Sequence, residues 1–298
     1  MKLTFLGTSS MLPTEDRNTT AIILNHKAEN ILIDCGEGTQ RQLRKAHISP
    51  AKITRLLITH WHGDHVLGIP GLLETLAKQN YTKTLYIYGP KGTKKYFKEM
   101  HKTFISQYNE IKIKIKEITK NEIFIDEKDF TVSSLKLDHT ITCYGYSFKE
   151  KDKRRINLSY TKKFGLTRDP ILGKLQQGKT ITYKGKKITP EKGTTTTPGK
   201  KITILLDSTK TKNMIKFAEN SDILVTESTL SNTLEKEAKK IKHLIPKHAA
   251  EIAKEAKVKK LILTHISQRY KNEKVLEKEA KKLFKNTVAV KDLDSFNI

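Results

Sequence analysis

Cysteine is nearly absent from this sequence: Cys35 and Cys143 are the only two in 298 residues, and they stand far apart in the chain. Without a CxxC pair, thiolates cannot form a structural zinc cage, and two distant thiols do not make a disulfide framework. We therefore expect two free, buried cysteines.

Long hydrophobic runs are missing as well. No stretch approaches the roughly 18 consecutive apolar residues of a membrane-spanning helix, and residues 1–7 enter a strand instead of forming a signal peptide. These two absences predict a cytoplasmic protein with no membrane partner. With 36% hydrophobic residues, the chain can still bury a sizeable core.

Acidic residues are scarce relative to basic ones. The chain has 57 Lys+Arg against 32 Asp+Glu, a net charge of +25. A surplus of this size favours a polyanionic partner, with nucleic acid as the leading candidate. The alternative is a general enrichment in lysine on solvated helix faces.

About half of the positive surplus lies in one segment, residues 149–201, which holds sixteen Lys/Arg and four Asp/Glu. Its apolar residues are so few and scattered that we expect no hydrophobic core there. The run Ile171-Leu172-Gly173-Lys174-Leu175 nevertheless favours some packing over a disordered loop. We predict a single domain over residues 1–298 that carries a basic arm within 149–201.

Short apolar or alternating runs predict β-strands along most of the chain, and amphipathic runs between them predict helices. The main predicted strands cover residues 2–6, 20–24, 31–33, 53–58, 85–88, 111–116, 130–137, 202–206, 223–225, 261–263 and 287–290. The main predicted helices cover residues 40–46, 68–79, 93–104, 248–256 and 271–284. This mixture predicts an α/β fold.

A histidine-rich stretch, His60-Trp61-His62-Gly63-Asp64-His65, follows the predicted strand 53–58. Imidazole nitrogens and carboxylate oxygens are ligands that zinc takes. His60 and His62 can converge on one ion, but the adjacent Asp64 and His65 must point elsewhere, so two neighbouring ions fit better than one. The alternatives are a solvated loop or a purely structural metal site.

Further candidate ligands stand at the ends of other predicted strands: His139, Asp207 and His265. With the histidine-rich stretch they make seven residues, a number that suits two zinc ions bridged by one carboxylate. Asp34, which ends strand 31–33 before a glycine-rich turn, is either a site residue or the cap of helix 40–46.

The order of these residues resembles the metallo-β-lactamase superfamily, whose HxHxDH pattern matches residues 60–65. Four longer segments narrow the resemblance to the ribonuclease Z family of tRNA 3′-processing endonucleases: FLGTSS at 5–10, DCGEGTQRQL at 34–43, HWHGDHVLGIPGLL at 60–73 and LILTHISQRY at 261–270. The resemblance covers essentially the whole chain. It implies an αββα sandwich with a dinuclear site at one sheet edge.

The resemblance also implies roles for individual residues. One zinc would be held by His60, His62 and His139, the other by Asp64, His65 and His265, with Asp207 as the bridge. Asp34 would orient a ligand histidine through its ring N–H.

Three residues are implicated in the reaction itself. Asp64 is expected to accept a proton from water as well as bind metal, and His243, placed by its spacing to His265, is expected to protonate the leaving 3′-oxygen. Glu227 would orient His243. The implied products are a tRNA with a 3′-hydroxyl and a trailer with a 5′-phosphate.

The basic segment stands where the family carries its tRNA-binding arm, so Lys174 and Lys179 are expected to contact precursor tRNA, as is Arg17 in the loop 13–18. The family reaction is usually run by a homodimer, in which one subunit's arm holds the tRNA that the other cuts. The sequence itself shows no dimer interface.

Some positions differ from the family pattern. Glu15 occupies a position where the family has lysine, which bears on how precursors already carrying CCA are treated. Asp169 replaces a glycine in the arm, and Leu244 and Ile245 follow His243 where the family has serine and threonine.

Two rival functions stay open at this point. One is a hydrolase of the same fold that acts on small substrates, such as a lactonase, an arylsulfatase or a cyclic-nucleotide phosphodiesterase. The other is an RNA-binding protein that has lost catalysis. The basic arm speaks against the first, and the complete set of seven ligands speaks against the second.

Overall fold

The computed structural model describes residues 1–104 and 111–298. These residues form two compact units. Unit 1 comprises Met1–Ile125, Val132–Phe148 and Lys201–Ile298, and unit 2 comprises Asp126–Thr131 and Lys149–Lys200. Within the described residues, no helix is both long and apolar enough to cross a membrane.

The first of two seven-stranded sheets is built mainly from the N-terminal half of the chain. Its strand order is β20 (Ser295–Asn297), β1 (Lys2–Gly7), β3 (Ala21–His26), β4 (Glu29–Ile33), β5 (Arg55–Leu57), β6 (Thr84–Pro90) and β7 (Lys112–Ile118). Pairing is antiparallel from β20 to β4 and parallel from β4 to β7. The carboxyl ends of β4 and β5 therefore meet at one edge.

The second sheet has the order β19 (Thr287–Ala289), β17 (Leu261–Thr264), β16 (Ile223–Glu227), β15 (Lys201–Leu205), β10 (Cys143–Glu150), β9 (Phe130–Leu137) and β8 (Ile123–Asp126). Strands β15, β16, β17 and β19 are parallel neighbours. Their carboxyl ends share an edge, as in other parallel sheets that carry sites there. A two-stranded parallel sheet of β2 (Ser9–Ser10) and β18 (Ile266–Ser267) joins the loops that follow β1 and β17.

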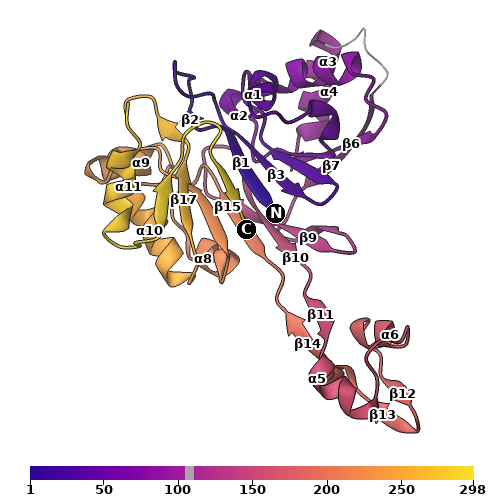
Figure 1. The fold of residues 1–298 in the computed structure, drawn as a ribbon. Coiled ribbons are helices and arrows are strands. Elements are labelled where there is room, and N and C mark those ends of the chain that lie inside the picture. The colour runs from indigo at the N-terminus through magenta and orange to yellow at the C-terminus, as the bar shows by residue number, and fades with distance from the viewer. Residues whose placement is uncertain (105–110) are drawn as a thin grey trace. The chain divides into compact units, whose positions relative to one another are not determined.

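Helices cover the outer face of each sheet (Figure 1). The first sheet packs against α1 (Thr39–Lys45), α2 (Gly63–Val66), α3 (Ile69–Lys78) and α4 (Thr93–Phe104). The second packs against α8 (Lys212–Ala218), α10 (Pro246–Glu255) and α11 (Lys274–Lys281), with α9 (Glu235–Lys240) nearby. The layers run helix, sheet, sheet, helix, so the predicted αββα sandwich is confirmed.

Strand β3 illustrates why the sequence folds into these layers. Ala21 and Ile23 pack into the core beneath the helices, while the alternate residues Ile22 and Leu24 are buried on the opposite face of the sheet. Successive side chains of a strand point to opposite faces. A strand with apolar residues on both faces, as at 21–24, therefore requires cover on both faces.

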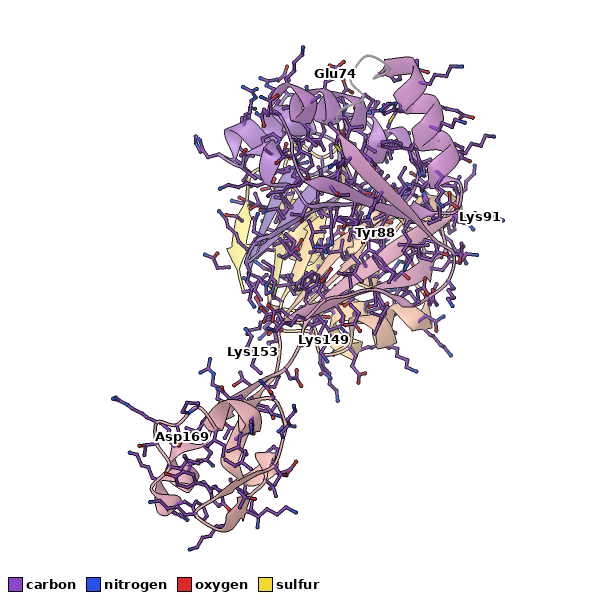
Figure 2. The ribbon with its side chains drawn as sticks, turned by 90° about the vertical axis from the view of Figure 1, so that its right-hand side faces the viewer. Glu74, Tyr88, Lys91, Lys149, Lys153 and Asp169 are labelled. Atoms are coloured by element: carbon purple, nitrogen blue, oxygen red, sulfur yellow. The ribbon has the colours of Figure 1, made fainter. Side chains whose placement is uncertain are left out.

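Unit 2 consists of short elements. A ladder of β11 (Lys153–Ile156) and β14 (Thr194–Thr197) and a hairpin of β12 (Ile181–Tyr183) and β13 (Lys186–Ile188) are joined by α5 (Leu158–Thr161), α6 (Leu172–Gln176) and α7 (Pro190–Gly193). Lys184 and Gly185 have positive φ angles of 47° and 73°, as a two-residue type I′ hairpin turn requires. Figure 2 labels Lys153 and Asp169 within this unit.

A small hydrophobic core holds unit 2 together, contrary to the prediction from its sequence. Its buried members are Leu166, Leu172, Leu175, Ile181 and Ile188. The expectation that this segment lacks a core is wrong, because apolar residues that are scattered in sequence converge once the hairpin and α6 form.

Most predicted elements lie within a few residues of the observed ones, and α4 has the predicted bounds. The observed helix α11 is shorter than the predicted helix 271–284. It begins at Lys274, whose amide donates a hydrogen bond to the side chain of Asn272. The predicted strand 287–290 is not the last, because β20 follows it and pairs with β1.

Candidate metal centre

Five of the predicted site residues follow strands at the edges where carboxyl ends meet. Asp34 follows β4, His60 follows β5, His139 follows β9, Asp207 follows β15 and His265 follows β17. Asp34 and His265 have φ angles of 56° and 55°. Left-handed backbone at residues other than glycine costs of order 1 kcal/mol and is often found at functional sites.

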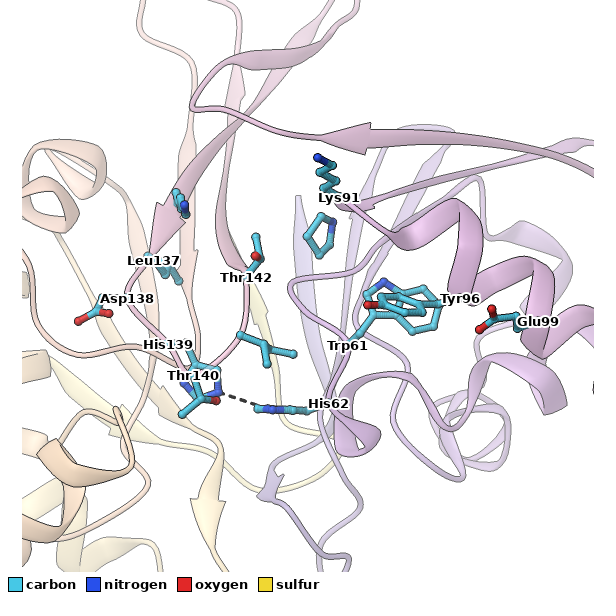
Figure 3. A pocket seen from close by; sticks show the side chains of 13 residues that line it. Trp61, His62, Lys91, Tyr96, Glu99, Leu137, Asp138, His139, Thr140 and Thr142 are labelled. Carbon is cyan, nitrogen blue, oxygen red and sulfur yellow. Dashed lines mark hydrogen bonds between the residues drawn. The ribbon is translucent and has the colours of Figure 1, made fainter.

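A pocket of about 860 Å³ opens beside this edge. His62 and His139 are part of its lining, and Figure 3 shows their rings side by side, with His139 Nε2 3.3 Å from His62 Nδ1. A second cavity of about 440 Å³ is lined by His243 and lysines. His139 is the one strand-end residue of these five that lines the first pocket, and His243 lines the second.

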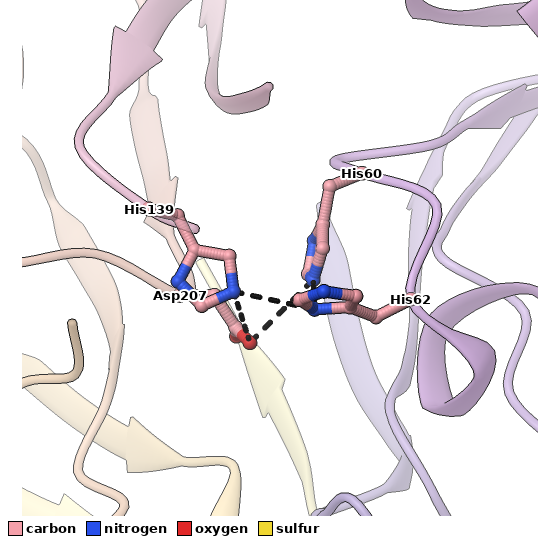
Figure 4. Close-up of side chains that lie close together, drawn as sticks. All are labelled: His60, His62, His139 and Asp207. Atoms are coloured by element: carbon pink, nitrogen blue, oxygen red, sulfur yellow. Dashed lines mark hydrogen bonds and ion pairs between the residues drawn. The ribbon is translucent and has the colours of Figure 1, made fainter. Parts of the chain in front are cut away.

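The first cluster joins three histidines and one aspartate (Figure 4). The distances are 2.9 Å from His60 Nε2 to His62 Nδ1, 3.3 Å from His139 Nε2 to His62 Nδ1, and 3.6 and 3.8 Å from Asp207 Oδ2 to His60 and His139 Nε2. Ligands spaced at the corners of a tetrahedron with zinc–nitrogen bonds of about 2.0–2.1 Å lie about 3.3 Å apart. The four atoms match that spacing.

The second cluster is formed by Asp64, His65 and His265. Asp64 Oδ2 lies 3.4 Å from His65 Nε2 and 3.3 Å from His265 Nε2, and the two ring nitrogens are 3.3 Å apart. Asp64 and His65 belong to helix α2, which begins directly after His62. The helical turn explains why they leave the first cluster. Burial raises the pKa of Asp64, but hydrogen bonds from His265 and His65 outweigh it and keep the carboxyl ionised.

Asp207 lies between the two clusters. Its Oδ2 is 3.6 Å from Nε2 of both His60 and His65, and its Oδ1 is 3.3 Å from His265 Nε2. Burial raises its pKa, but the charges of His265 and His65 outweigh this and hold the pKa well below its usual range. Oδ1 is buried without a hydrogen-bond partner among the described residues. Because an unpaired buried carboxylate oxygen is costly, the donor set fits a bound cation.

Four of the ligand rings are held in the same orientation. Each donates its Nδ1–H away from the centre and turns Nε2 inward: His60 to Thr59 Oγ1 at 3.0 Å, His65 to Asp34 Oδ2 at 2.7 Å, His139 to the Lys242 carbonyl at 3.2 Å and His265 to Thr229 Oγ1 at 3.0 Å. Such contacts orient histidine ligands and fix the nitrogen that binds metal. Burial also lowers the pKa of three rings, which keeps them neutral: His60, His62 and His139.

Asp34 contacts His65 instead of capping a helix. Its carboxylate accepts hydrogen bonds from the Thr59 amide, the Thr59 hydroxyl and the His65 ring, each at 2.7 Å. The alternative interpretation is wrong, because α1 begins after Gly38 and has no side-chain cap.

His243 and Glu227 form a pair beside the second cluster. His243 Nδ1 donates to Glu227 Oε2 at 2.9 Å, and the Ser208 amide donates to Glu227 Oε1 at 2.8 Å. Burial lowers the pKa of His243, but the Glu227 carboxylate outweighs it and raises the pKa to about 9. A fully buried carboxylate thus contacts the imidazole and favours its protonated form.

Two threonines of this site were missed by sequence reasoning. Thr229 Oγ1 donates to Glu227 Oε2 at 2.6 Å while it accepts from His265, and Thr59 Oγ1 links Asp34 to His60 in the same way. Threonines are ordinary at strand ends. The only signal was their position beside a carboxylate or histidine at the end of a buried strand.

The residues predicted to contact RNA are placed differently from one another. Lys174 and Lys179 are exposed on unit 2. Arg17 is only 6% exposed, and its guanidinium donates to Glu273 Oε2 at 2.8 Å and to the Tyr270 carbonyl at 3.0 Å. A guanidinium enclosed in this way is not available to a phosphate, so we correct its assignment to one of holding the loop 13–18 in place.

Proteins of known name match the chain along its length. Residues 1–172 match the family of Anti-Pycsar protein Apyc1. A ribonuclease Z from Enterococcus faecalis is 40% identical, covering 100% of this chain and 97% of its own. The solved structure of human tRNase Z, short form, superposes with a TM-score of 0.75 and 26% identity over 100% of this chain and 99% of its own.

A more distant solved structure shows the fold alone. The metallo-β-lactamase fold protein YhfI from Bacillus subtilis has a TM-score of 0.72 and 21% identity, covering 99% of this chain and 98% of its own. The αββα sandwich is therefore the metallo-β-lactamase fold.

Proposed function

Because the chain belongs to the ribonuclease Z family, and its residues 1–172 also to the family of Anti-Pycsar protein Apyc1, we propose that it is an endoribonuclease that matures tRNA 3′ ends. It hydrolyses one phosphodiester bond of a tRNA precursor. The products are a tRNA with a 3′-hydroxyl and a trailer with a 5′-phosphate. The action is proposed to take place in the cytoplasm.

The observation that carries the proposal is the pair of donor clusters joined by Asp207 in a chain that matches a ribonuclease Z over its whole length. His60, His62 and His139 would hold one zinc ion of a pair, Asp64, His65 and His265 would hold the other, and Asp207 would bridge them. Two such ions supply a water of pKa about 7 and neutralise charge on the phosphate.

The side chains of the centre have complementary proton-transfer roles in this proposal. Asp64, whose carboxyl stays ionised, accepts a proton from the attacking water. His243, protonated through Glu227, gives a proton to the leaving 3′-oxygen. Glu227 is fixed by the Ser208 amide and Thr229, so its carboxylate holds the imidazole in one orientation.

Recognition of the precursor is proposed to come from unit 2. Its exposed lysines, among them Lys174 and Lys179, would contact tRNA phosphates, which position the RNA without reading its sequence. The active species is proposed to be a homodimer in which the arm of one subunit serves the centre of the other. Sedimentation velocity would test the dimer directly.

The decisive experiment is cleavage of a 5′-labelled precursor tRNA by the purified protein, with and without a chelator. We expect a cut after the discriminator base that chelation abolishes and zinc restores. Asp64→Ala should not cut, whereas Glu219→Ala, an exposed carboxylate at the end of α8, should cut normally. Zinc-loaded protein that binds the precursor without cutting it would replace this proposal by RNA binding alone.

A further inference from the structure

The larger pocket beside the metal centre has one aromatic wall. Trp61 and Tyr96 pack with ring centroids 5.3 Å apart, and Figure 3 shows them across the pocket from Leu137 and Thr142. Tyr96 is 45% exposed although its neighbours on α4 include a buried Phe97. An exposed aromatic ring in a pocket is a surface on which a planar group can stack.

This wall is held in place by hydrogen bonds. The indole Nε1–H of Trp61 donates to Thr93 Oγ1 at 2.9 Å, and the Thr93 hydroxyl donates to the Pro90 carbonyl at 2.7 Å. Thr93 is fully buried at the start of α4. A ring fixed in this way loses little conformational entropy when a ligand stacks on it.

The lining of the same pocket carries two lysines and two carboxylates, Glu99 and Asp138, of which Asp138 is paired with Lys242. Lys91 and Lys136 are both exposed in its lining, and neither forms an ion pair with another described residue. Fixed aromatic rings beside lysines are the combination with which proteins bind single-stranded nucleic acid: bases stack, and the cations follow the backbone.

The position of His243 assigns a direction to the RNA, a step that rests on the proposed function. His243 would protonate the leaving 3′-oxygen, which belongs to the mature tRNA. It lines the second cavity, whereas His62, on the far side of His139, lines the aromatic pocket. The trailer, which carries the 5′-phosphate, then extends toward the aromatic pocket.

We propose that this pocket binds the first bases of the trailer by stacking on Tyr96 and Trp61, with Lys91 and Lys136 near the trailer phosphates. Stacking accepts every base, because each has a flat face. The larger rings of purines should be favoured modestly. The pocket thus makes the enzyme sensitive to the presence of trailer bases more than to their identity.

The test compares two precursors that share one tRNA and differ only in the trailer, which has either ordinary bases or abasic residues at its first two positions. Wild-type protein should cut the ordinary precursor with a kcat/KM roughly 5- to 100-fold higher, the range expected for one stacked base. Tyr96→Ala should cut the ordinary precursor more slowly and should discriminate less between the two, because only Trp61 is left to stack on. Phe104→Ala, an exposed aromatic on the same helix, should behave as wild type.

A binding measurement separates this proposal from the proposed function. With 2-aminopurine as the first trailer base, fluorescence should fall when the precursor binds Asp64→Ala, and should not fall with Asp64→Ala/Tyr96→Ala. Quenching without any cleavage by wild-type protein would refute the nuclease and leave the stacking site standing. Equal cutting of both precursors by wild type, or discrimination that is undiminished in Tyr96→Ala, would overturn the stacking site.

Discussion

The two units carry their charge in opposite ways. In unit 1, the carboxylates of the centre are enclosed: Asp34 and Glu227 are fully buried and Asp207 is 2% exposed. In unit 2, the lysines lie on the surface around a core of five apolar side chains. Buried charges interact with partners at fixed positions and are little affected by salt. Exposed charges attract a partner through their combined charge, and dissolved salt screens that attraction. Unit 1 is therefore suited to chemistry and unit 2 to holding a polyanion.

The largest effect should come from the protonated imidazole of unit 1. His243→Ala removes the proton donor to the leaving oxygen, and we expect kcat to fall by roughly 10²- to 10⁴-fold. Affinity for precursor tRNA should hardly change, because the side chain is 8% exposed and contacts Glu227. Single-turnover cleavage and filter binding, measured side by side, would show this; a loss of binding with unchanged kcat would place His243 in recognition instead.

A smaller loss is expected from Thr229→Val, which keeps the shape of the side chain and removes its hydroxyl. Glu227 then loses a donor and His265 loses the acceptor that fixes its Nδ1–H. Contacts of this kind are typically worth 10- to 100-fold in metal affinity or activity. Zinc titration and kcat should both decline in Thr229→Val and recover in Thr229→Ser. If Thr229→Ser is as impaired as Thr229→Val, the hydroxyl is not the cause.

The sequence could predict those residues of the centre that lie in a recognisable local pattern, and it could not predict contacts between residues far apart in the chain. The seven metal-ligand candidates were visible because each follows a buried strand or lies in the HxHxDH stretch, and strand ends gather at sheet edges. The burial of Arg17 could not be seen, since Glu273 lies 256 positions away. The two threonines carry no distinctive local pattern, and the core of unit 2 depends on short elements whose apolar residues are spread over 166–188.

In unit 2, we expect substitutions to change the salt dependence of tRNA binding and to leave the rate of cleavage unchanged. Lys174→Ala/Lys179→Ala removes two exposed cations, so KM for precursor tRNA should rise about tenfold at moderate salt, with kcat unchanged. The slope of log affinity against log salt should become shallower by about 1.4 to 1.8, the contribution of two phosphate contacts. Lys216→Ala/Lys254→Ala, two lysines of unit 1 helices, serves as the charge-matched control. An unaltered slope would exclude these two lysines from the RNA contact.

The smallest effect concerns stability alone and a half-buried carboxyl of unit 1 away from the centre. Asp292 accepts hydrogen bonds from the Thr8 hydroxyl, the Asn18 amide and the Gln42 side chain. Burial is the largest influence on its pKa and raises it from 3.8 to about 6. The folded state thus holds this proton more tightly than the unfolded state does.

The sign of the pH dependence follows from that difference. The contribution of Asp292 to stability is greatest below pH 3.8, declines as the pH rises to about 6 and stays low above that. The total decline is up to about 3 kcal/mol, at roughly 1.4 kcal/mol per pKa unit. Asp292→Asn cannot ionise, so its unfolding free energy relative to wild type should rise between pH 4 and 6 in urea denaturation. Asp152→Asn, which removes an exposed carboxylate of unit 2, is measured beside it as the control. If the difference in unfolding free energy between Asp292→Asn and wild type does not vary with pH, the three hydrogen-bond donors stabilise the carboxylate enough to cancel the effect of burial.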